Sequence, residues 1–583
     1  MMMFRRWYVL LFLFFCIFAN LGSLEAQSRT RKLSAAAAAA AGRKHDSPLG
    51  GGTKASSRRS SSQQRTAQAY ATLLYGDEFL LGVRVLGKSI RDTGVDKDMV
   101  ALVSDGVSKS GIELLEADGW RVERIDLLKN PNSKRPARFW GVYTKLRIFN
   151  MTDYEKVVYL DADTIVLRSI EDLFACQGFC ANLKHSERLN SGVMVVEPSV
   201  SLFEDMVSKI KSTYSYTGGD QGFLNSYYPD FPNAHLFEPE LSSEVRKSRP
   251  APKMERLSTL YNADVGLFAL ANKWMVEESE LRVMHYTLGP LKPWDWWTAW
   301  LLSPVIVWQD VRVTLEDALP GTGQGQTPYT TLVVRSLFLF PFLFLAFLKR
   351  SFLLEVQKDL CALVCSGSFC ACARHLWHKY KPSGSLPNYS MVNSSISNGC
   401  KHQGCSNPIG GGVVNPSCRV PKHLGIISIL VCFLTVFLSL GAAALLVPRQ
   451  VMPWTGMVLT YEWVIFMFTL LFGKFLDVVY SYGRSTASSV SSSAVDTTLQ
   501  YSASKGHSRN TISWDMETIT YGALMVILAI SIPAVPCVMG VSAILARVGL
   551  MVAVGFVLIA VTTYTSEHLA IHWFLRGYDD WIR

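Results

Sequence analysis

Hydrophobic residues are gathered into long blocks near the start and in the second half of this chain, and between them lies one region of alternating apolar and polar stretches. The first block follows Arg5 and Arg6 and carries no charge, so we assign 1–26 to a signal peptide or a membrane anchor. Five later blocks approach the roughly 17 to 25 residues that a helix needs to cross a bilayer. The predicted membrane spans are 331–349, 424–447, 456–473, 518–540 and 541–564.

The alternating region, 67–330, has the pattern of an α/β domain. Short apolar runs predict buried strands, and apolar residues at helical spacing predict helices between them. The predicted strands are 70–75, 99–104 and 157–160, and the predicted helices are 77–91, 111–117 and 143–150. This alternation predicts a mostly parallel sheet that binds ligands at the carboxyl ends of its strands. The chain is thus expected to join an α/β domain to a polytopic helical membrane domain.

Several polar segments have no apolar period that could join a core. Residues 27–66 contain seven consecutive alanines and a Ser- and Arg-rich stretch, so we expect a disordered stem. A Cys-rich loop, 350–423, and a Ser-rich loop, 474–517, separate the later spans. A short tail, 565–583, follows the last span.

Composition and charge exclude several classes of protein. Of the 583 residues, 49% are hydrophobic and 18% are charged, which excludes a disordered tail protein and a collagen-like chain. The net charge of +10 would fit nucleic-acid binding, but +7 of it lies in 22–66. The rest of the chain carries only the remaining +3, so no nucleic-acid partner is expected.

Lysine and arginine counts in the connecting loops predict the topology, because cytoplasmic loops hold the excess. Nine lie in 349–423, whereas the short connection 448–455 holds only Arg449, so both long loops and the tail are predicted to be cytosolic. The region 67–330 then faces a lumen. The basic stem would favour the opposite orientation behind an uncleaved anchor, and cleavage of a signal peptide removes that conflict.

Three N-glycosylation sequons test this topology. Those at Asn388 and Asn393 lie in the loop assigned to the cytosol, so glycans there would overturn the orientation. The sequon at Asn150 lies in the region assigned to the lumen, where burial in a helix would leave it unmodified.

Cysteine usage is uneven. Seven of the twelve cysteines lie between Cys361 and Cys418, where a zinc site, acylation and reduced thiols without a shared role all stay open. Cys176 and Cys180 are the only cysteines in 67–330. They either form a lumenal disulfide or stay reduced.

Two carboxylates at a predicted strand end are the first candidates for chemistry. Asp161 and Asp163 directly follow the strand 157–160. Carboxylates placed in this way can hold a divalent cation together with diphosphate oxygens. The triplet 96–98 has the same Asp-x-Asp spacing but lies in a polar turn, so we expect no function for it.

Three further clusters follow in order. They are Asn190-Ser191-Gly192, the run 218–222 (Gly-Gly-Asp-Gln-Gly) and the segment 285–294 (His-Tyr-Thr-Leu-Gly-Pro-Leu-Lys-Pro-Trp). Together with the aspartate pair, this order and spacing resembles the family 8 glycosyltransferases, which include glycogenin, over about 67–300. The resemblance implies a GT-A (Rossmann-like) fold, a nucleotide-sugar donor, Mn²⁺ as cofactor and retention of the anomeric configuration.

The resemblance also implies roles for individual residues. Asp161, Asp163 and His285 correspond to the metal ligands, a donor set that suits manganese. The residues expected to bind the donor nucleotide are Leu73, Tyr75, Phe79, Lys145, Ala162, Gly289 and Lys292. Those expected to bind the donor sugar are Asn190, Ser191, Asp220 and Gln221, of which the last two are also the expected catalytic residues.

The expected mechanism follows from these roles. Lys292 and the metal neutralise the uridine diphosphate leaving group, while the acceptor attacks the sugar face that this group leaves. A double displacement would instead need a carboxylate nucleophile, for which Asp220 is the one candidate. Thr217 stands where glycogenin has an aspartate beside the sugar, which lowers repulsion toward an acidic sugar.

The membrane half indicates the acceptor. Four tryptophans within 294–300, with Trp308 close behind, are typical of a membrane interface, although they can also pack against the domain itself. A family 8 domain followed by several spans resembles the plant inositol phosphorylceramide glucuronosyltransferases. This implies transfer of glucuronic acid from UDP-glucuronate to inositol phosphorylceramide at the Golgi membrane. The cation that meets the glucuronate carboxylate is left open among Arg147, Lys184, His185 and Arg188.

Two other functions stay open from the sequence. One is a family 8 transferase with a polysaccharide or protein acceptor. The other is a non-enzymatic membrane scaffold or transporter that carries an inert domain. The intact set Asp161, Asp163, His285 and Lys292 favours an enzyme. The sequence indicates no oligomeric state.

Overall fold

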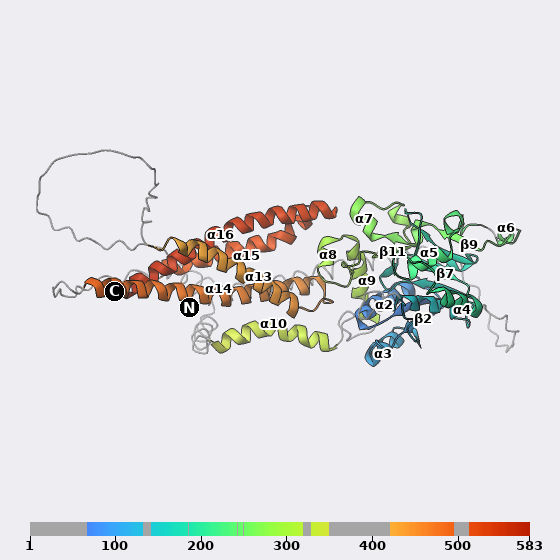
Figure 1. Cartoon of the computed structure of the whole chain (residues 1–583), viewed down its shortest axis with the longest axis horizontal. Coiled ribbons are helices and arrows are strands. Elements are labelled where there is room, and N and C mark those ends of the chain that lie inside the picture. The colour runs from blue at the N-terminus through green and yellow to red at the C-terminus, as the bar shows by residue number, and fades with distance from the viewer. Residues whose placement is uncertain are drawn as a thin grey trace, which may run out of the picture.

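A computed structural model describes residues 67–131, 141–184, 186–241, 243–248, 250–318, 328–348, 420–494 and 512–582. These residues form an α/β domain and a set of long helices that extend away from it (Figure 1). The predicted fold class, a GT-A α/β domain followed by a helical membrane domain, is confirmed. The predictions for 1–26 and 27–66, for nearly all of the Cys-rich loop and for part of the Ser-rich loop lie outside the described residues.

The α/β domain is built on an eight-stranded sheet with the order β3-β2-β1-β4-β7-β6-β9-β8. Neighbouring strands are parallel except at β7, which runs antiparallel to β4 and β6, so the predicted mostly parallel sheet is confirmed. The strands are β1 (Gln68–Leu74), β2 (Asp98–Val103), β3 (Arg121–Arg124), β4 (Lys156–Leu160), β6 (Phe179–Leu183), β7 (Leu189–Val196), β8 (His235–Leu236) and β9 (Met254–Leu257).

Alternation of side chains along these strands produces an apolar layer on each face of the sheet. Val158 packs on one face with α2 (Leu80–Asp92) and α3 (Lys109–Ala117). Val157 packs on the other face, which is covered by three helices. These are η2 (Val142–Asn150), α4 (Val200–Lys209) and α5 (Asp220–Tyr227). The helix predicted at 143–150 is present as a 3-10 helix over Val142–Asn150.

A smaller sheet, with the order β10-β11-β5, was not predicted from the sequence. Strand β5 (Thr164–Val166) pairs antiparallel with β11 (Val283–His285), which pairs in parallel with β10 (Ala263–Asp264). Its strands are only two or three residues long, too short for a periodic signal. The remaining elements of the domain are η1 (Asp77–Phe79), η3 (Glu171–Ala175), η4 (Phe231–Asn233), α6 (Ser243–Ser248), η5 (Thr259–Tyr261), α7 (Val265–Ala271), η6 (Glu278–Glu280), α8 (Thr298–Leu301) and α9 (Pro304–Ala318).

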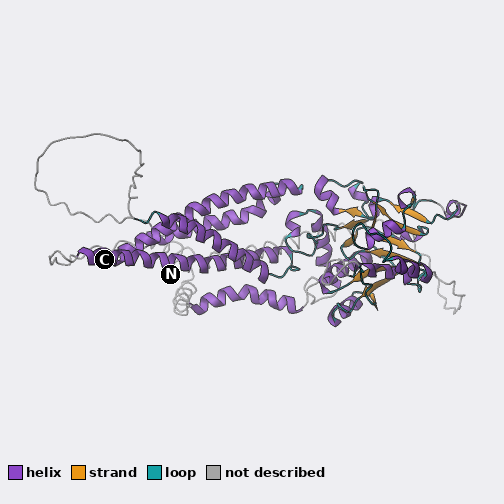
Figure 2. Cartoon of the chain, viewed as in Figure 1, coloured by secondary structure: helices purple, strands orange, loops and turns teal. Residues whose placement is uncertain are grey.

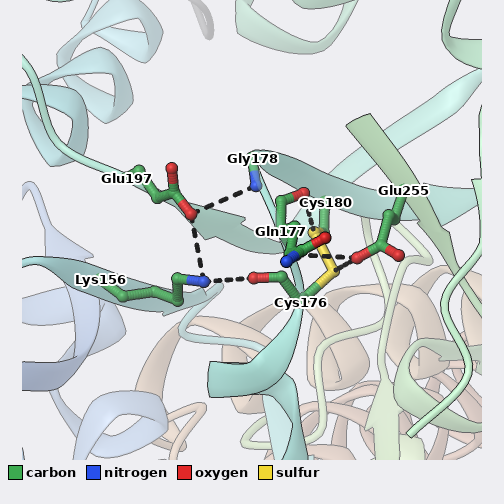
Figure 3. Close-up of a disulfide and its surroundings, with 7 residues drawn as sticks. All are labelled: Lys156, Cys176, Gln177, Gly178, Cys180, Glu197 and Glu255. Carbon is green, nitrogen blue, oxygen red and sulfur yellow. Dashed lines mark hydrogen bonds and ion pairs between the residues drawn. A yellow bond between two sulfur atoms is a disulfide. The ribbon is translucent and has the colours of Figure 1, made fainter. Parts of the chain in front are cut away.

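Cys176 and Cys180 are joined by a disulfide at the amino end of β6 (Figure 3). The backbone amide of Gln177 donates to Glu255 Oε2 at 2.8 Å, and Lys156 donates to the carbonyl of Cys176. Strands β4 and β6 run in the same direction, so this bridge lies at the edge of the sheet opposite the carboxyl ends of β4 and β6. Of the two alternatives for this cysteine pair, the structure contains the disulfide.

Long helices form the second part of the molecule (Figure 2). They are α10 (Pro328–Leu348), α13 (His423–Leu446), α14 (Pro453–Ala494), α15 (Ile512–Val538) and α16 (Ile544–Ile582). Among the described residues, four helical segments are long and apolar enough to cross a membrane, and the apolar part of α10 is shorter, Tyr329–Phe344. The four segments are His423–Leu446, Pro453–Ser489, Thr520–Val538 and Ile544–Ile582.

Helices α14 and α16 continue well beyond the predicted spans 456–473 and 541–564. The two helices pack along each other, and in their later halves Leu476 and Phe574 belong to one buried apolar cluster. Tertiary packing therefore stabilises these helices beyond the apolar runs from which the spans were predicted.

Candidate active site

The carboxyl edge of the sheet brings two distant parts of the chain together. Asp161 and Asp163 follow β4, and His285 ends β11, where it lies opposite Thr164 of β5. One ligand atom from each of Asp161, Asp163 and His285 lies within 4.8 Å of the others. The imidazole Nε2 is 3.3 Å from Asp163 Oδ1 and 3.9 Å from Asp161 Oδ2. Atoms with these spacings can converge on one cation.

A second layer of contacts fixes the imidazole of His285. Its Nδ1 lies 3.0 Å from Asn262 Oδ1, so the ring directs Nε2 at the carboxylates. Asn262 is fully buried and donates from Nδ2 to Asn190 Oδ1 at 2.9 Å. On the other side, a Cβ added to Gly192 would lie 2.1 Å from His285 Cε1. Two carboxylates and one oriented imidazole nitrogen fit a divalent metal of the manganese type.

Lys292 lies beside the same carboxylates. Its Nζ is 2.5 Å from Asp163 Oδ2 and donates to the carbonyl of Tyr286 at 3.1 Å. Burial alone would raise the pKa of Asp163, but His285 and Lys292 outweigh that effect and hold this pKa well below its usual range. Asp163 is therefore ionised and available as an anionic ligand.

Asp161, Asp163 and His285 are together called the metal cluster, meaning the candidate ligands of one cation. Lys145 connects this cluster to the residues expected to bind the sugar. Its Nζ lies 2.9 Å from Asp161 Oδ1 and 3.0 Å from Asp220 Oδ2, and it also donates to Ser191. Burial would lower the pKa of Lys145, but Asp161 and Asp220 outweigh that effect and raise the pKa above its usual range. The ammonium group thus stays charged and neutralises both carboxylates.

The residues expected to bind the donor sugar form one hydrogen-bonded group. Asn190 Nδ2 donates to Gln221 Oε1 at 3.1 Å, and the Ser191 hydroxyl donates to Asp220 Oδ2 at 2.8 Å. Asn190 and Ser191 lie at the start of β7, and Asp220 and Gln221 open α5. The structure therefore brings both pairs together, next to the metal cluster.

The residues expected to bind the nucleotide are less closely connected. Tyr75 adjoins the site, since burial and then Asp220 and Asp161 raise its pKa well above the usual range. Phe79 packs edge to face on Trp294, with ring centroids 5.7 Å apart. The carbonyl of Ala162 lies close to α2, where a Cβ added to Gly82 would be 2.7 Å from it. Leu73 is buried in β1, and Gly289 follows β11 in a loop without a contact that ties it to the cluster in the described part of the chain.

Some residues of this network carry no clear signal in the sequence. Asn262 is one of them, because its position against His285 depends on the unpredicted pairing of β10 with β11. Lys184 donates to the carbonyl of Asn262 at 2.8 Å and lies 3.6 Å from Asp264. A pattern of a few residues cannot reveal contacts across about 80 positions of chain.

The loop between α13 and α14 docks onto the α/β domain beside this site. Arg449 Nη2 lies 2.9 Å from Asp295 Oδ2, only three residues beyond Lys292. Gln450 Nε2 donates to the carbonyl of Glu78, next to Phe79, at 2.8 Å. One short loop of the membrane half therefore contacts both the segment just beyond Lys292 and the segment next to Phe79.

Two buried arginines complete this junction. Arg312 of α9 donates to the carbonyls of Gln450 and Val451, and Arg547 of α16 donates to the carbonyl of Trp300 at 3.2 Å. Both guanidinium groups donate to backbone carbonyls at the junction of the α/β domain with the membrane helices. The membrane helices and the α/β domain are thus held together by backbone contacts as well as by side chains.

The tryptophans are divided between the two roles considered for them. Trp294 and Trp308 are buried in the apolar core of the α/β domain. Trp300 packs edge to face on Trp454 of α14, with centroids 4.8 Å apart, and Trp296 lies against Gly456. The expectation of an interfacial cluster is therefore corrected for Trp294 and Trp308, which fill space between α2 and α9 instead.

Comparison with known proteins gives consistent matches. The family model described as glycosyl transferase family 8 matches residues 72–178. Inositol phosphorylceramide glucuronosyltransferase 1 of Arabidopsis thaliana is 57% identical over 512 residues, which cover 88% of this chain and 92% of that protein. UDP-glucuronate:xylan alpha-glucuronosyltransferase 1 of the same plant is 37% identical over 28% of this chain and 25% of its own length. A solved structure of the galactosyltransferase LgtC, with 17% identity, covers 39% of this chain and 89% of its own with a TM-score of 0.29.

Proposed function

Because this chain belongs to glycosyltransferase family 8, in the group of the inositol phosphorylceramide glucuronosyltransferases, we propose that it transfers glucuronic acid from UDP-glucuronate to inositol phosphorylceramide with retention of the anomeric configuration. The observation that carries this proposal is the convergence of Asp161, Asp163 and His285 beside Lys292 and Lys145 at the carboxyl edge of the sheet. Two carboxylates, an imidazole and two ammonium groups at this edge suit a metal-bound diphosphate.

Mn²⁺ is assigned to Asp161, Asp163 and His285. When bound, the metal supplies positive charge that stabilises a departing nucleoside diphosphate. Lys292 adds an ammonium on a flexible stem, which can turn from Asp163 Oδ2 to a phosphate oxygen. Lys145 keeps Asp161 and Asp220 in fixed positions around the donor.

The surroundings of Asp220 favour a single displacement on one face of the sugar. Its carboxylate is paired with Lys145 at 3.0 Å and accepts the Ser191 hydroxyl at 2.8 Å, and both contacts weaken it as a nucleophile. The acceptor oxygen therefore bonds to the anomeric carbon while the bond to the UDP oxygen breaks. The acceptor proton passes to the departing phosphate.

The lipid acceptor is supported by the way the site is held. The loop between α13 and α14 contacts the α/β domain on both sides of the expected nucleotide site through Arg449 and Gln450. A site attached in this way lies close to the ends of the membrane helices, where a lipid headgroup can reach it. An acceptor that is a soluble polysaccharide would not need this attachment.

The α/β domain is assigned to the Golgi lumen. It shares its side of the membrane helices with the loop after α13, which carries only one basic residue, Arg449. The disulfide between Cys176 and Cys180 needs an oxidising compartment. Both observations agree with the topology derived from the Lys and Arg counts.

The test is a transfer assay with the full-length protein in lipid nanodiscs, given Mn²⁺, inositol phosphorylceramide and radiolabelled UDP-glucuronate or UDP-glucose. We expect label in a lipid from UDP-glucuronate, no label with Asp163→Ala, and the same α linkage in donor and product by NMR. Label in protein or polysaccharide would refute the lipid acceptor, and a β linkage would refute retention.

A further inference from the structure

The carboxylate that distinguishes glucuronate from glucose must meet a cation in the donor-sugar pocket. Among the basic residues near the pocket in sequence, Lys184 is committed elsewhere, because its Nζ donates to the Asn262 carbonyl and lies 3.6 Å from Asp264. The guanidinium of Arg147 lies over the ring of Phe203 in α4, 5.5 Å from its centroid, and no contact in the described part of the chain joins Arg147 or Phe203 to the residues expected to bind the sugar. His185 lies outside the described residues. Arg188 is left.

Arg188 lies in the turn between β6 and β7, two residues before Asn190. Its guanidinium carbon is 3.8 Å from the ring centroid of Tyr216. The Tyr216 hydroxyl accepts a hydrogen bond from Gln221 Nε2 at 3.3 Å, and Gln221 is itself bonded to Asn190. Arg188 is therefore held at the rim of the group of residues assigned to the donor sugar.

The guanidinium of Arg188 is available for an anion. In the described part of the chain no ion pair joins it to a carboxylate, in contrast to Lys145, Lys184 and Lys292. Its side chain is exposed. Stacking on Tyr216 fixes the plane of the guanidinium and leaves its N–H edges free for two parallel hydrogen bonds.

The two lysines deeper in the pocket are already paired with carboxylates, which favours Arg188 as the partner of the sugar carboxylate. Lys145 is shared between Asp161 and Asp220, and Lys292 lies against Asp163, so neither has charge to spare for a sugar carboxylate in addition to the diphosphate. Thr217 is neutral and uses its hydroxyl to accept from the amides of Gly219 and Gly222 at the start of α5. This position, next to Tyr216 in the chain, therefore adds no negative charge near Arg188.

We propose that Arg188 determines donor specificity: its guanidinium binds the carboxylate of an acidic donor sugar and thereby selects UDP-glucuronate over UDP-glucose. This inference rests on the proposed function, because it names the residue that recognises the donor of the same site. Arg188 is a specificity-determining residue and not a catalytic one, since it contacts the sugar away from the anomeric carbon.

The test compares wild type, Arg188→Ala, Arg188→Lys and the control Arg168→Ala in nanodiscs that contain inositol phosphorylceramide. Arg168 is an exposed arginine beyond β5 and outside the site. For each protein, kcat/KM is measured with UDP-glucuronate and with UDP-glucose, and the Kd of UDP alone is measured by calorimetry. The affinity for UDP reports whether the rest of the site is intact.

We expect Arg188→Ala to lower kcat/KM for UDP-glucuronate roughly 10- to 100-fold, the range for loss of a hydrogen-bonded charge pair. The value for UDP-glucose and the Kd of UDP should stay unchanged, Arg188→Lys should lie between wild type and Arg188→Ala, and Arg168→Ala should match wild type. Three results for Arg188→Ala would refute the role of Arg188 without refuting the proposed function. They are an equal loss of kcat/KM with both donors, weaker UDP binding, and undiminished use of UDP-glucuronate. Failure of the wild type to use UDP-glucuronate would overturn the proposed function as well.

Discussion

Asp163 links two other side chains of the candidate site, because it lies against both His285 and Lys292. We predict that Asp163→Ala lowers transfer about 100-fold or more and weakens Mn²⁺ binding measured by electron paramagnetic resonance. The triplet 96–98 supplies a matched control, since Asp96 is exposed and lies in the loop between α2 and β2. Asp96→Ala should behave as wild type. Undisturbed Mn²⁺ binding in Asp163→Ala would remove Asp163 from the ligand set.

Gly192 allows a test of His285 in which none of the candidate ligands is itself substituted. A methyl group there would lie 2.1 Å from His285 Cε1, so Gly192→Ala must displace the imidazole. We expect Mn²⁺ affinity to fall roughly 10- to 100-fold, as it does when the support of a ligand is lost. At Gly441 of α13 an added Cβ meets nothing, so Gly441→Ala serves as the control. Equal Mn²⁺ affinity in both variants would contradict the assignment of His285.

At the same scale, the sequence predicted the three candidate ligands that the structure brings together, but not the residues that position them. Each of the three candidate ligands, Asp161, Asp163 and His285, belongs to a short sequence motif that can be recognised without the structure. Asn262 and Gly192 act on His285 only because β11 lies beside β10 and close to β7. Lys145 was expected near the donor, and the structure adds that it bridges Asp161 and Asp220.

Among the elements, the loop between α13 and α14 joins the membrane half to the active site. Because Arg449 contacts Asp295 and Gln450 contacts the Glu78 carbonyl, the double variant Arg449→Ala/Gln450→Ala should loosen both sides of the nucleotide site. We expect KM for the UDP-sugar to rise roughly two- to tenfold, with protein yield unchanged. Arg484→Ala, at the far end of α14, is the matched control. An unchanged KM would mean that the loop only anchors the domain.

Strands β1, β2 and β4 and helices α2 and α3 of the α/β domain could be predicted because each contributes an apolar run or a helical stripe. The reversal of β7 could not, because an antiparallel strand buried on both faces has the same apolar run as a parallel one. The lengths of α14 and α16 were underestimated for a different reason. Their later halves are stabilised by packing on each other and not by an apolar run of their own.

For the whole molecule, the exposed Asn150 provides a test of topology. This residue ends η2 and is accessible, so in a lumenal domain its sequon can receive a glycan. We predict an endoglycosidase-sensitive gel shift that Asn150→Gln removes, and protection of the α/β domain from added protease in sealed Golgi vesicles. A shift that depends on Asn388 or Asn393, or cleavage of the domain in sealed vesicles, would reverse the orientation.

The most direct test of the central claim is the mass of the lipid product. Full-length protein in nanodiscs is incubated with Mn²⁺, inositol phosphorylceramide and an equimolar mixture of UDP-glucuronate and UDP-glucose, and the lipids are analysed by tandem mass spectrometry. We predict a lipid that has gained one hexuronosyl group on its inositol, and its absence when Mn²⁺ is chelated or Asp163 is replaced by Ala. A product that has gained a hexose instead, or an acceptor lipid that stays unmodified, would contradict it.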